Sequence, residues 1–372
     1  MPVGSLSRTL TRLTLRLVPL TPVHIGDGTE MRLDEYFLEN DSLCRFDPSK
    51  AMRAMNAQQR EKFGKSDDLR VLAQMLRAAG KGCVEERIAI TQTSRRELGQ
   101  AIDDPNNRTG AVRPFVRGSG RPYIPGSSVK GAFRTALASA ALPRDCRDQE
   151  SWDHDSAMQA ALGADPRDTT KDPLRFLHIS DVLLPEGCTV IDRAEIFHPK
   201  KPNARNMQMH YERTRSLAED SAAITFEATV MIDSRAMEIA PLQARFSARG
   251  LIDTVRAFHA RLFNREVAAF FEDPNLTMQR KLTAHKAPDG RPPIIEQKFQ
   301  SDFLLLRLGR FGHFESKSLD GVRRGHFPQL KKFGKEIGSP DQGGHTRTVV
   351  RIGDKVIPFG WVIGWVVKEE TL

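Results

Sequence analysis

One stretch of the chain constrains the fold more than any other, because it predicts a strand, a tight loop and a helix in direct succession. Residues 122–137 read PYIPGSSVKGAFRTAL. Ser127 or Ser128 is predicted to cap the helix, since a hydroxyl accepts a bond from an early backbone N–H. Pro143 ends the run, because proline lacks the donor that a helix interior needs. The apolar residues of this helix fall at helical spacing and would face a core: Val129, Phe133, Leu137 and Ala140.

The start of this predicted helix also has the chemistry that suits a phosphate. Lys130 and Arg134 are four residues apart, so they share one face near the helix N-terminus. Backbone amides without partners and the helix dipole attract anions to that end. An ordinary capped helix with a solvated basic edge is the alternative, and this stretch alone does not decide between the two.

The charge balance favours an acidic partner. Among 372 residues, 56 Lys and Arg stand against 47 Asp and Glu, which gives a net charge of +9. Nucleic acid is the commonest partner of such a protein, although a basic protein without that role is possible. With 39% hydrophobic and 28% charged residues, the chain has the composition of a globular protein of two or three domains.

Targeting signals and metal-binding patterns are not expected. No apolar run approaches the ~20 residues of a membrane helix, and the N-terminus lacks the apolar region of a secretion signal. The cysteines form no C-x-x-C pair, which argues against structural zinc and fits reduced thiols in a cytoplasm. They are Cys44, Cys83, Cys146 and Cys188. We therefore expect a cytoplasmic protein with no metal and no cofactor.

The first half of the chain alternates strands with one long helical block. Leu13, Leu15 and Leu17 alternate with polar residues, which predicts a strand over 9–20. A loop with two glycines follows at 21–28, where a partner can approach the backbone closely. We expect a strand pair near 35–38 and 43–46, a helical insertion over 48–80, and an exposed loop over 103–121.

The second half repeats the same kinds of element. A basic segment over 198–216 has few apolar residues, and we expect a projecting loop or hairpin there. The other predicted elements are a short helix near 156–162, a strand over 174–184, a strand from 222, a long helix over 251–271, and strands over 303–308 and 356–367.

This order of elements predicts an α+β fold. It suits two ferredoxin-like units, in which helices cover one face of an antiparallel sheet. We expect the first domain over residues 1–190, with the helical insertion near 48–102, and the second over residues 191–372.

Four short motifs resemble a known family. They are VHIG at 23–26, YIPGSSVKG at 123–131, the glycine-rich loop that starts at Gly309, and PFGWV at 358–362. Together they resemble the RAMP proteins of type III CRISPR effectors, above all the fifth-subunit family of the type III-A Csm complex. The motif at 123–131 is the most specific of the four, while H-I-G alone would be weak.

The resemblance implies two ferredoxin-like (RRM-like RAMP) domains and a non-catalytic RNA-binding role in antiviral defence. Such a subunit caps the backbone at the 3′ end of the guide (CRISPR) RNA and supports guide-RNA maturation. The implied partners are that RNA, the repeating backbone RAMP subunit, the small helical subunit and maturation nucleases. The RNA-binding residues it implies are His24, Gly26, Gly28, Ser127, Ser128, Lys130, Arg134, Gly309, Arg310, Gly312 and Lys317.

A basic segment near the C-terminus supports RNA binding on physical grounds. Residues 307–335 combine eight cations with interleaved phenylalanines: Arg307, Arg310, Lys317, Arg323, Arg324, Lys331, Lys332 and Lys335, with Phe311, Phe314, Phe327 and Phe333. Cations pair with phosphates and aromatic rings stack on the bases of a single strand. We expect at least half of these rings to lie in the core instead. Backbone and phosphate contacts predict little sequence specificity.

An endoribonuclease is the rival function. His24 lies in a glycine loop, where an imidazole could transfer a proton near neutral pH. Asp34 lies where a metal-dependent RAMP nuclease would have its aspartate. A nucleotide-binding enzyme ranks third, because a P-loop needs glycine directly before its lysine and this chain has Val129 there.

Overall fold

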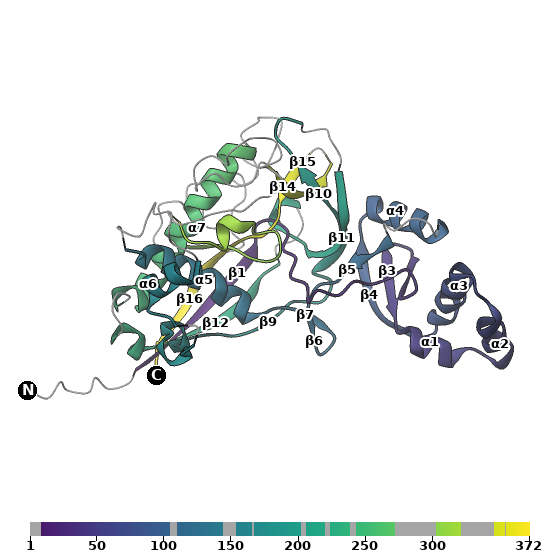
Figure 1. The fold of residues 1–372 in the computed structure, drawn as a ribbon, viewed down its shortest axis with the longest axis horizontal. Helices are drawn as coiled ribbons and strands as arrows, with labels where there is room; N and C mark the ends of the chain where they lie inside the picture. Colours follow the sequence, from purple (N-terminus) through teal and green to yellow (C-terminus); the bar gives the residue numbers. More distant parts are fainter. Residues whose placement is uncertain are drawn as a thin grey trace, which may run out of the picture.

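A computed structural model describes most of the chain. The described residues are 9–104, 110–143, 154–165, 167–201, 206–219, 224–238, 243–271, 303–320, 346–353 and 355–372. They form an α+β fold with a five-stranded sheet at one end, a larger sheet in the middle and a group of helices at the other end (Figure 1). The mixed α+β class predicted from the sequence is confirmed.

The five-stranded sheet is built around the predicted N-terminal strand. β1 (Leu10–Pro19) buries Leu13, Leu15 and Leu17, so the leucine alternation places one face of the strand in the core. Its antiparallel neighbours are β12 (Phe226–Asp233) and β16 (Trp361–Thr371). The complete order is β13 (Phe303–Arg307), β16, β1, β12 and β8 (Leu177–Ile179).

Two long helices pack against this sheet and against each other. They are α5 (Gly126–Ala141) and α7 (Ala248–Phe270), as expected from their apolar spacing. Val129, Phe133 and Leu137 of α5 are fully buried, which confirms the predicted core face. Helix α6 (His154–Leu162) lies beside α5, close to its predicted place.

The larger sheet has eight strands and connects the two ends of the molecule. Its main path is β15 (Lys355–Pro358), β14 (Arg347–Ile352), β10 (Thr189–Phe197), β4 (Val84–Ile90), β3 (Ser42–Phe46) and β2 (Tyr36–Glu39). β11 (Asn206–Thr214) pairs with β10 and with β5 (Val112–Arg113). β10 meets β4 through two parallel residue pairs only, Val190 with Ala89 and Ile191 with Ile90.

The segment predicted as a helical insertion contains four helices, which we call the helical lobe, with strand β4 between the third and the fourth. These are α1 (Pro48–Ala54), α2 (Ala57–Lys65), α3 (Leu69–Gly80) and α4 (Gln92–Asp103). Each begins at a polar residue whose side chain accepts a backbone N–H: Asp47, Asn56, Asp68 and Thr91. The lobe lies at the opposite end of the molecule from the five-stranded sheet (Figure 1).

The remaining elements are short. A three-stranded sheet has the order β6 (Arg117–Gly118), β7 (Arg121–Ile124) and β9 (Val182–Leu183). The 3-10 turns are η3 (Thr169–Lys171), η4 (Pro173–Phe176), η5 (Leu217–Glu219), η6 (Ser234–Glu238), η7 (Gln243–Phe246) and η9 (Phe314–Ser316). No described helix combines the length and the apolar character needed to cross a membrane.

Four predicted elements differ from the structure. The exposed loop predicted over 103–121 contains β5 and β6 and buries Val112 and Phe115. The strand predicted over 174–184 is a 3-10 turn followed by β8 and β9. The last strand is interrupted at Gly360, whose φ of +97° turns the chain between β15 and β16. The segment over 198–216 contains β11, one strand of a hairpin with β10, and the described end of that strand lies within the fold. Arg213 is only 1% exposed, because Asp192 and Glu219 bind its guanidinium within the fold.

Both sheets combine strands from the two sides of residue 190. β1 pairs with β12 and β16, while β4 pairs with β10. The sheets therefore do not divide where the sequence order suggested a boundary between consecutive domains.

Candidate nucleic-acid interface

His24 lies beneath the surface of the first glycine loop. Its side chain is 2% exposed, and its Nδ1 lies 2.7 Å from the backbone carbonyl oxygen of Glu212. The rings of Phe115, Tyr211 and Phe311 surround the imidazole. Burial lowers the pKa of His24 from 6.5 to about 4, so the ring is neutral near neutral pH. The side chain therefore anchors the loop from below and is not part of its surface.

Backbone hydrogen bonds join the first glycine loop, the Gly309 loop and the turn at Gly360, which contain three of the four family-like motifs. The N–H of Arg310 donates to the carbonyl of His24 at 2.9 Å, which links the first loop to the Gly309 loop. The N–H of Leu308 donates to Gly360 at 2.8 Å, and the N–H of Gly360 donates to Pro22 at 2.7 Å. Segments more than 280 residues apart in sequence thus lie against one another, and we call them the joined loops.

Glycine is required where these loops touch. Gly309 has a φ of +85°, and a Cβ there would lie 2.3 Å from the carbonyl oxygen of His24. A Cβ on Gly360 would lie 2.6 Å from the carbonyl oxygen of Leu308. Gly312 is buried, and a Cβ there would lie 2.7 Å from Ser316 Oγ. These three glycines are explained by close packing within the protein, whereas Gly26 and Gly28 are exposed.

Two exposed cations lie in the joined loops. Arg310 and Lys317 form no ion pair with any described residue. Lys317 Nζ lies 3.4 Å from the carbonyl oxygen of Arg310, so the two residues are neighbours. Burial, Arg310 and Arg307 lower the pKa of Lys317. A phosphate placed here would relieve the repulsion between the two cations.

The phenylalanines of the basic segment 307–335 could stack on bases or pack in the core, and Phe311 packs in the core. Its ring packs on Tyr211 and Phe359 and is 9% exposed, so the core interpretation is confirmed for Phe311. Phe314 is half-buried. The rest of the predicted basic segment lies outside the described residues: Arg323, Arg324, Phe327, Lys331, Lys332, Phe333 and Lys335.

A buried ion-pair network supports the loops from inside the fold. Glu266 of α7 accepts hydrogen bonds from Arg307, from Arg347 Nε at 2.6 Å and from Trp361 Nε1 at 2.6 Å. Burial alone would raise the pKa of Glu266, but the two guanidinium groups hold it below its ordinary value. Arg347 also binds Glu315, which lies in the Gly309 loop. The network thus fixes the helix, two strands and the loop to one another.

The N-terminus of α5 already has a carboxylate of the protein beside it. The N–H of Gly126 donates to Asp181 Oδ1 at 2.7 Å. Pro125 is the N-cap and no side chain caps the helix, so the prediction that Ser127 or Ser128 caps it is wrong. The helix begins two or three residues earlier than expected, which places Ser127 and Ser128 inside its first turn. Ser127 is exposed and Ser128 is half-buried.

The two cations on α5 differ in their surroundings. Arg134 Nη1 binds Asp172 Oδ2 at 2.5 Å, so its charge is partly used within the protein. Lys130 is half-buried and forms no ion pair with a described residue, and burial lowers its pKa. Of the two cations predicted to bind a phosphate, Lys130 is therefore the more available one.

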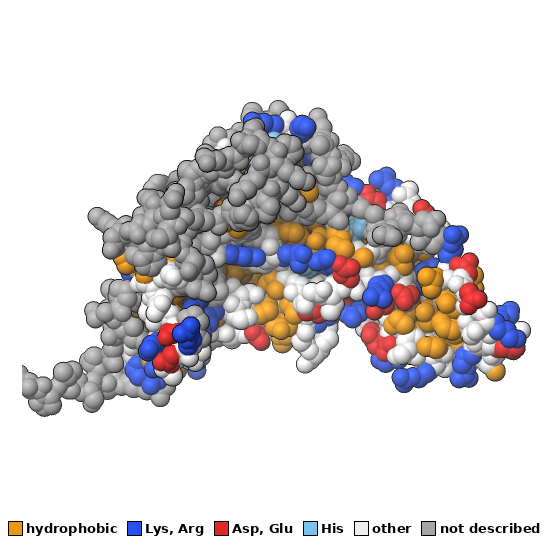
Figure 2. All heavy atoms as spheres, viewed as in Figure 1, with side chains coloured by type: hydrophobic (Ala, Val, Ile, Leu, Met, Phe, Trp, Pro, Cys, Tyr) orange, Lys and Arg blue, Asp and Glu red, His pale blue; other side chains and the backbone are white. Residues whose placement is uncertain are grey.

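The predicted residues fall into two groups with the β6–β7 hairpin between them. The N–H of Val116 donates to Ile25 at 2.7 Å, and the N–H of Tyr123 donates to Val116 at 3.2 Å. Strand β7 then leads directly into the start of α5. Figure 2 shows basic side chains in a row across the middle of the visible face, between areas of hydrophobic side chains.

One carboxylate that organises this region has no signal in the local sequence. Glu212 of β11 is fully buried and binds both terminal nitrogens of Arg117, at 2.7 and 2.8 Å. It also accepts the N–H of Phe115 at 2.8 Å. Arg117 Nη2 also donates to Glu86 Oε1 of β4 at 2.6 Å. A lone glutamate and a lone arginine 95 residues apart have no local pattern that would reveal their pairing.

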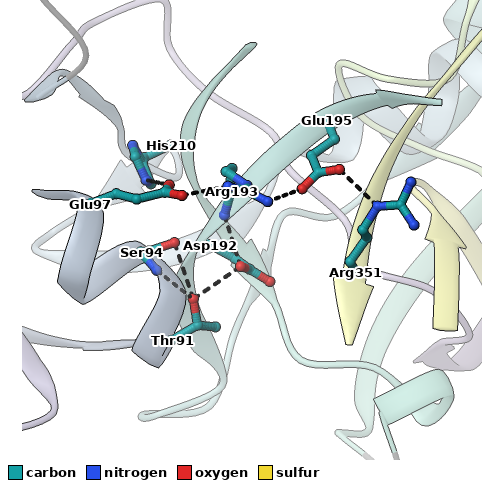
Figure 3. Close-up of polar contacts among 8 residues, drawn as sticks. All are labelled: Thr91, Ser94, Glu97, Asp192, Arg193, Glu195, His210 and Arg351. Atoms are coloured by element: carbon teal, nitrogen blue, oxygen red, sulfur yellow. Dashed lines mark hydrogen bonds and ion pairs between the residues drawn. The ribbon is translucent and has the colours of Figure 1, made fainter. Parts of the chain in front are cut away.

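A second polar network crosses the larger sheet (Figure 3). Arg193 of β10 binds Glu97 of α4 on one side and Glu195 on the other. Arg351 of β14 donates to Glu195 at 2.8 Å. Glu97 also lies 3.2 Å from His210 of β11. The chain of contacts attaches α4 to three strands.

Asp34, the candidate aspartate of a metal-dependent nuclease, lies in the turn before β2 and is half-buried. Among the residues that the structure describes, no three His, Cys, Asp or Glu side chains are grouped as metal ligands would be.

Comparisons with known proteins give relatives over different parts of the chain. The chain is 27% identical over 204 residues to the CRISPR system Cms protein Csm5 of Methanocaldococcus jannaschii, and 33% identical over 135 residues to that of Streptococcus thermophilus. These matches cover 50% and 33% of this chain. They cover 45% and 37% of the relatives, so the chain spans less than half of the length of the curated relatives it matches.

Solved structures share the fold over nearly all of the chain. A chain in the cryo-EM structure of a Csm–crRNA–target RNA ternary complex from a type III-A CRISPR-Cas system aligns with a TM-score of 0.61 at 15% identity, covering 95% of this chain and 100% of that one. The crystal structure of T. onnurineus Csm5 aligns with a TM-score of 0.55 at 16% identity, covering 94% and 99%. The family model of the RAMP superfamily matches residues 16–299. The chain therefore belongs to the RAMP superfamily.

Proposed function

We propose that the chain is a non-catalytic RNA-binding subunit of a type III-A CRISPR effector complex. It caps the backbone of the complex at the 3′ end of the guide RNA and supports guide-RNA maturation in the cytoplasm. Membership in the RAMP superfamily and the similarity to two Csm5 proteins support this role. Its partners are then the guide RNA, the repeating backbone subunit, the small helical subunit and maturation nucleases.

One observation carries the proposal more than any other: the joined loops present exposed backbone together with exposed cations. Gly26 and Gly28 leave the backbone of the first loop open, and Arg310 and Lys317 lie beside it without carboxylate partners among the described residues. Backbone amides and cations contact phosphates and sugars, whatever the base. We therefore expect tight, salt-dependent RNA binding with little sequence preference.

We propose two ferredoxin-like units that are interleaved along the chain. The strand–helix–strand–strand–helix–strand order of such a unit is present in β1, α5, β8, β12, α7 and β16. Its sheet order, β16-β1-β12-β8, is the antiparallel 4-1-3-2 arrangement, with β13 added at the edge. The larger sheet is our candidate for the second unit. Each unit then combines segments from both sides of residue 190, so a boundary at that residue divides the sequence but does not separate the two units.

The absence of RNA cleavage is also part of the proposal. A general acid or base must reach the substrate, and the imidazole of His24 is buried under its own loop. Incubation of the purified chain with labelled RNA and Mg²⁺ tests this point. Cleavage that disappears in His24→Ala or Asp34→Ala would contradict the binding role.

Complex assembly provides the decisive experiment. The tagged chain is co-expressed with the other subunits of a type III-A complex and a CRISPR array, in cells without another fifth subunit. We expect the backbone subunit and guide RNA to co-purify with the chain. Guide RNA that assembles on the backbone subunits while the chain stays free would overturn the proposal.

A further inference from the structure

The helical lobe has a groove that the proposed function does not use. It runs between α3 and α4 and encloses about 650 Å³. Its lining combines basic and amide side chains with a few apolar ones: Phe37, Leu38, Gln74, Arg77, Ala78, Lys81, Arg95, Arg96, Gly99, Gln100, Ile102 and Asp103. Four of these residues are basic and one is acidic.

The basic side chains of this groove are available to a ligand. Lys81, Arg95 and Arg96 are exposed, and none of them forms an ion pair with a residue that the structure describes. Arg77 is half-buried and donates to the carbonyl oxygen of Leu33 at 3.0 Å. Four cations share the lining with a single carboxylate, that of Asp103. This excess of positive charge attracts an anion, and a concave surface strengthens the field.

Helix α4 presents these cations from a fixed position. Its inner face carries Ser94, Glu97 and Leu98, which are spaced three and four residues apart. Figure 3 shows this face attached to the larger sheet: Thr91 at the helix start donates to Asp192 at 3.0 Å, and Glu97 binds Arg193. The contacts of Thr91 and Glu97 thus fix the helix to the sheet. Arg95 and Arg96 lie outside this inner face and are exposed.

The chemistry of the lining distinguishes between two kinds of acidic partner. An amphipathic acidic helix needs an apolar pocket for its anchor residues, but Phe37 is only 6% exposed and the other apolar side chains are small or half-buried. Guanidinium groups fit phosphates through paired N–H donors, and amides such as Gln74 and Gln100 contact phosphate and sugar oxygens. No ring in the lining is exposed enough to stack on a base.

We propose that the groove between α3 and α4 is a second RNA-binding surface, which holds the phosphate backbone of a single strand without reading its bases. This inference rests on the proposed function, since it extends the path of the bound RNA from the loops to the helical lobe. The groove adds affinity through Arg95 and Arg96 in particular.

The test compares three double variants of the full-length chain in a binding titration with a labelled, unstructured single-stranded RNA at several salt concentrations. The groove variant is Arg95→Ala with Arg96→Ala, and the loop variant is Arg310→Ala with Lys317→Ala. Arg53→Ala with Arg60→Ala is the matched control, because both arginines are exposed on the helical lobe and outside the groove. Circular dichroism checks that each variant is folded.

We expect the groove variant to bind about 25-fold more weakly at about 0.1 M salt, with a log–log salt slope smaller by about 1.4, since each lost phosphate contact of a single strand changes the slope by about 0.7. The control keeps the affinity and slope of the unmodified chain. If the groove variant keeps them too while the loop variant weakens, the groove inference is overturned and the proposed function stands.

Other outcomes are equally decisive. An unmodified chain that binds no RNA overturns both proposals. If only the groove variant binds RNA more weakly, the assignment of the loops as an RNA-binding surface is overturned and the groove inference stands. A labelled polyglutamate peptide that binds the chain, and is lost from the groove variant while RNA binding is unchanged, would assign the groove to an acidic protein segment instead.

Discussion

Arginines have opposite roles in the sheets and on the helical lobe. Arg213 of β11 is almost fully buried, and it binds Asp192 and Glu219, each at 2.6 Å. Arg95 and Arg96 of α4 are exposed, and no described carboxylate pairs with either of them. A buried guanidinium needs partners because its desolvation is costly, whereas an exposed one keeps its donors for a ligand. A net charge of +9 therefore does not reveal which cations can bind RNA.

The largest effect we expect is the loss of a buried carboxylate. Glu266→Gln removes the negative charge that Arg307 and Arg347 share inside the fold. Two guanidinium groups would remain buried with less compensation, and breaking a buried pair costs about 3–5 kcal/mol. Urea denaturation measures the free energy of unfolding. The exposed pair of Arg16 and Glu227 provides the control, and Glu227→Gln should change stability by less than about 1 kcal/mol.

The pH dependence of stability tests the buried imidazole. The pKa of His24 is lowered from 6.5 to about 4 by burial, so the unfolded chain binds a proton between these pH values and the folded chain does not. Stability should therefore fall by about 2 kcal/mol between about pH 7 and about pH 5 through this group. His24→Asn keeps a donor for the carbonyl of Glu212 and should lose that part of the dependence. If the stability of the variant and of the unmodified chain falls equally over this pH range, another group is responsible for the pH dependence.

The third effect is on RNA affinity and compares cations with and without carboxylate partners. Arg310→Ala with Lys317→Ala should weaken RNA binding about 25-fold at about 0.1 M salt, because two phosphate contacts are lost. Arg12→Ala with Lys368→Ala removes the same charge from residues that both lie near Glu370. If both double variants weaken binding equally, net charge decides the affinity and the joined loops have no special role.

Elements with a strong local pattern were predictable from the sequence. The leucine alternation in β1 and the apolar spacing of α5 and α7 place their core faces correctly. Strand β10 was missed, because its burial depends on charged residues that pair across the sheet. Asp192 and Glu195 are both buried in it, and nothing near them in the sequence indicates their partners.

The candidate site was predictable only in part, because contacts between residues far apart in the sequence also shape it. Glycine motifs correctly indicated loops, and the structure joins the His24 loop to the Gly309 loop. Whether a residue faces solvent depends on distant neighbours, so the burial of His24 beneath Tyr211 and the carboxylate of Asp181 beside Gly126 could not be read from local sequence. Those long-range contacts decide which predicted residues an RNA strand can meet.

The smallest expected effect separates the two cations of α5, which the sequence treats as equivalent. Arg134 is bound to Asp172 at 2.5 Å, while Lys130, one turn earlier, forms no ion pair with a described residue. If an RNA phosphate lies at this helix, Lys130→Ala removes one contact and should weaken binding about fivefold at about 0.1 M salt. Arg134→Ala should leave RNA affinity nearly unchanged, because the guanidinium already has its anion. The two single variants carry the same change in charge on one helix face, so titration with one RNA compares them directly. Equal weakening by both would mean that RNA displaces Asp172, and the distinction between paired and free cations would fail on α5.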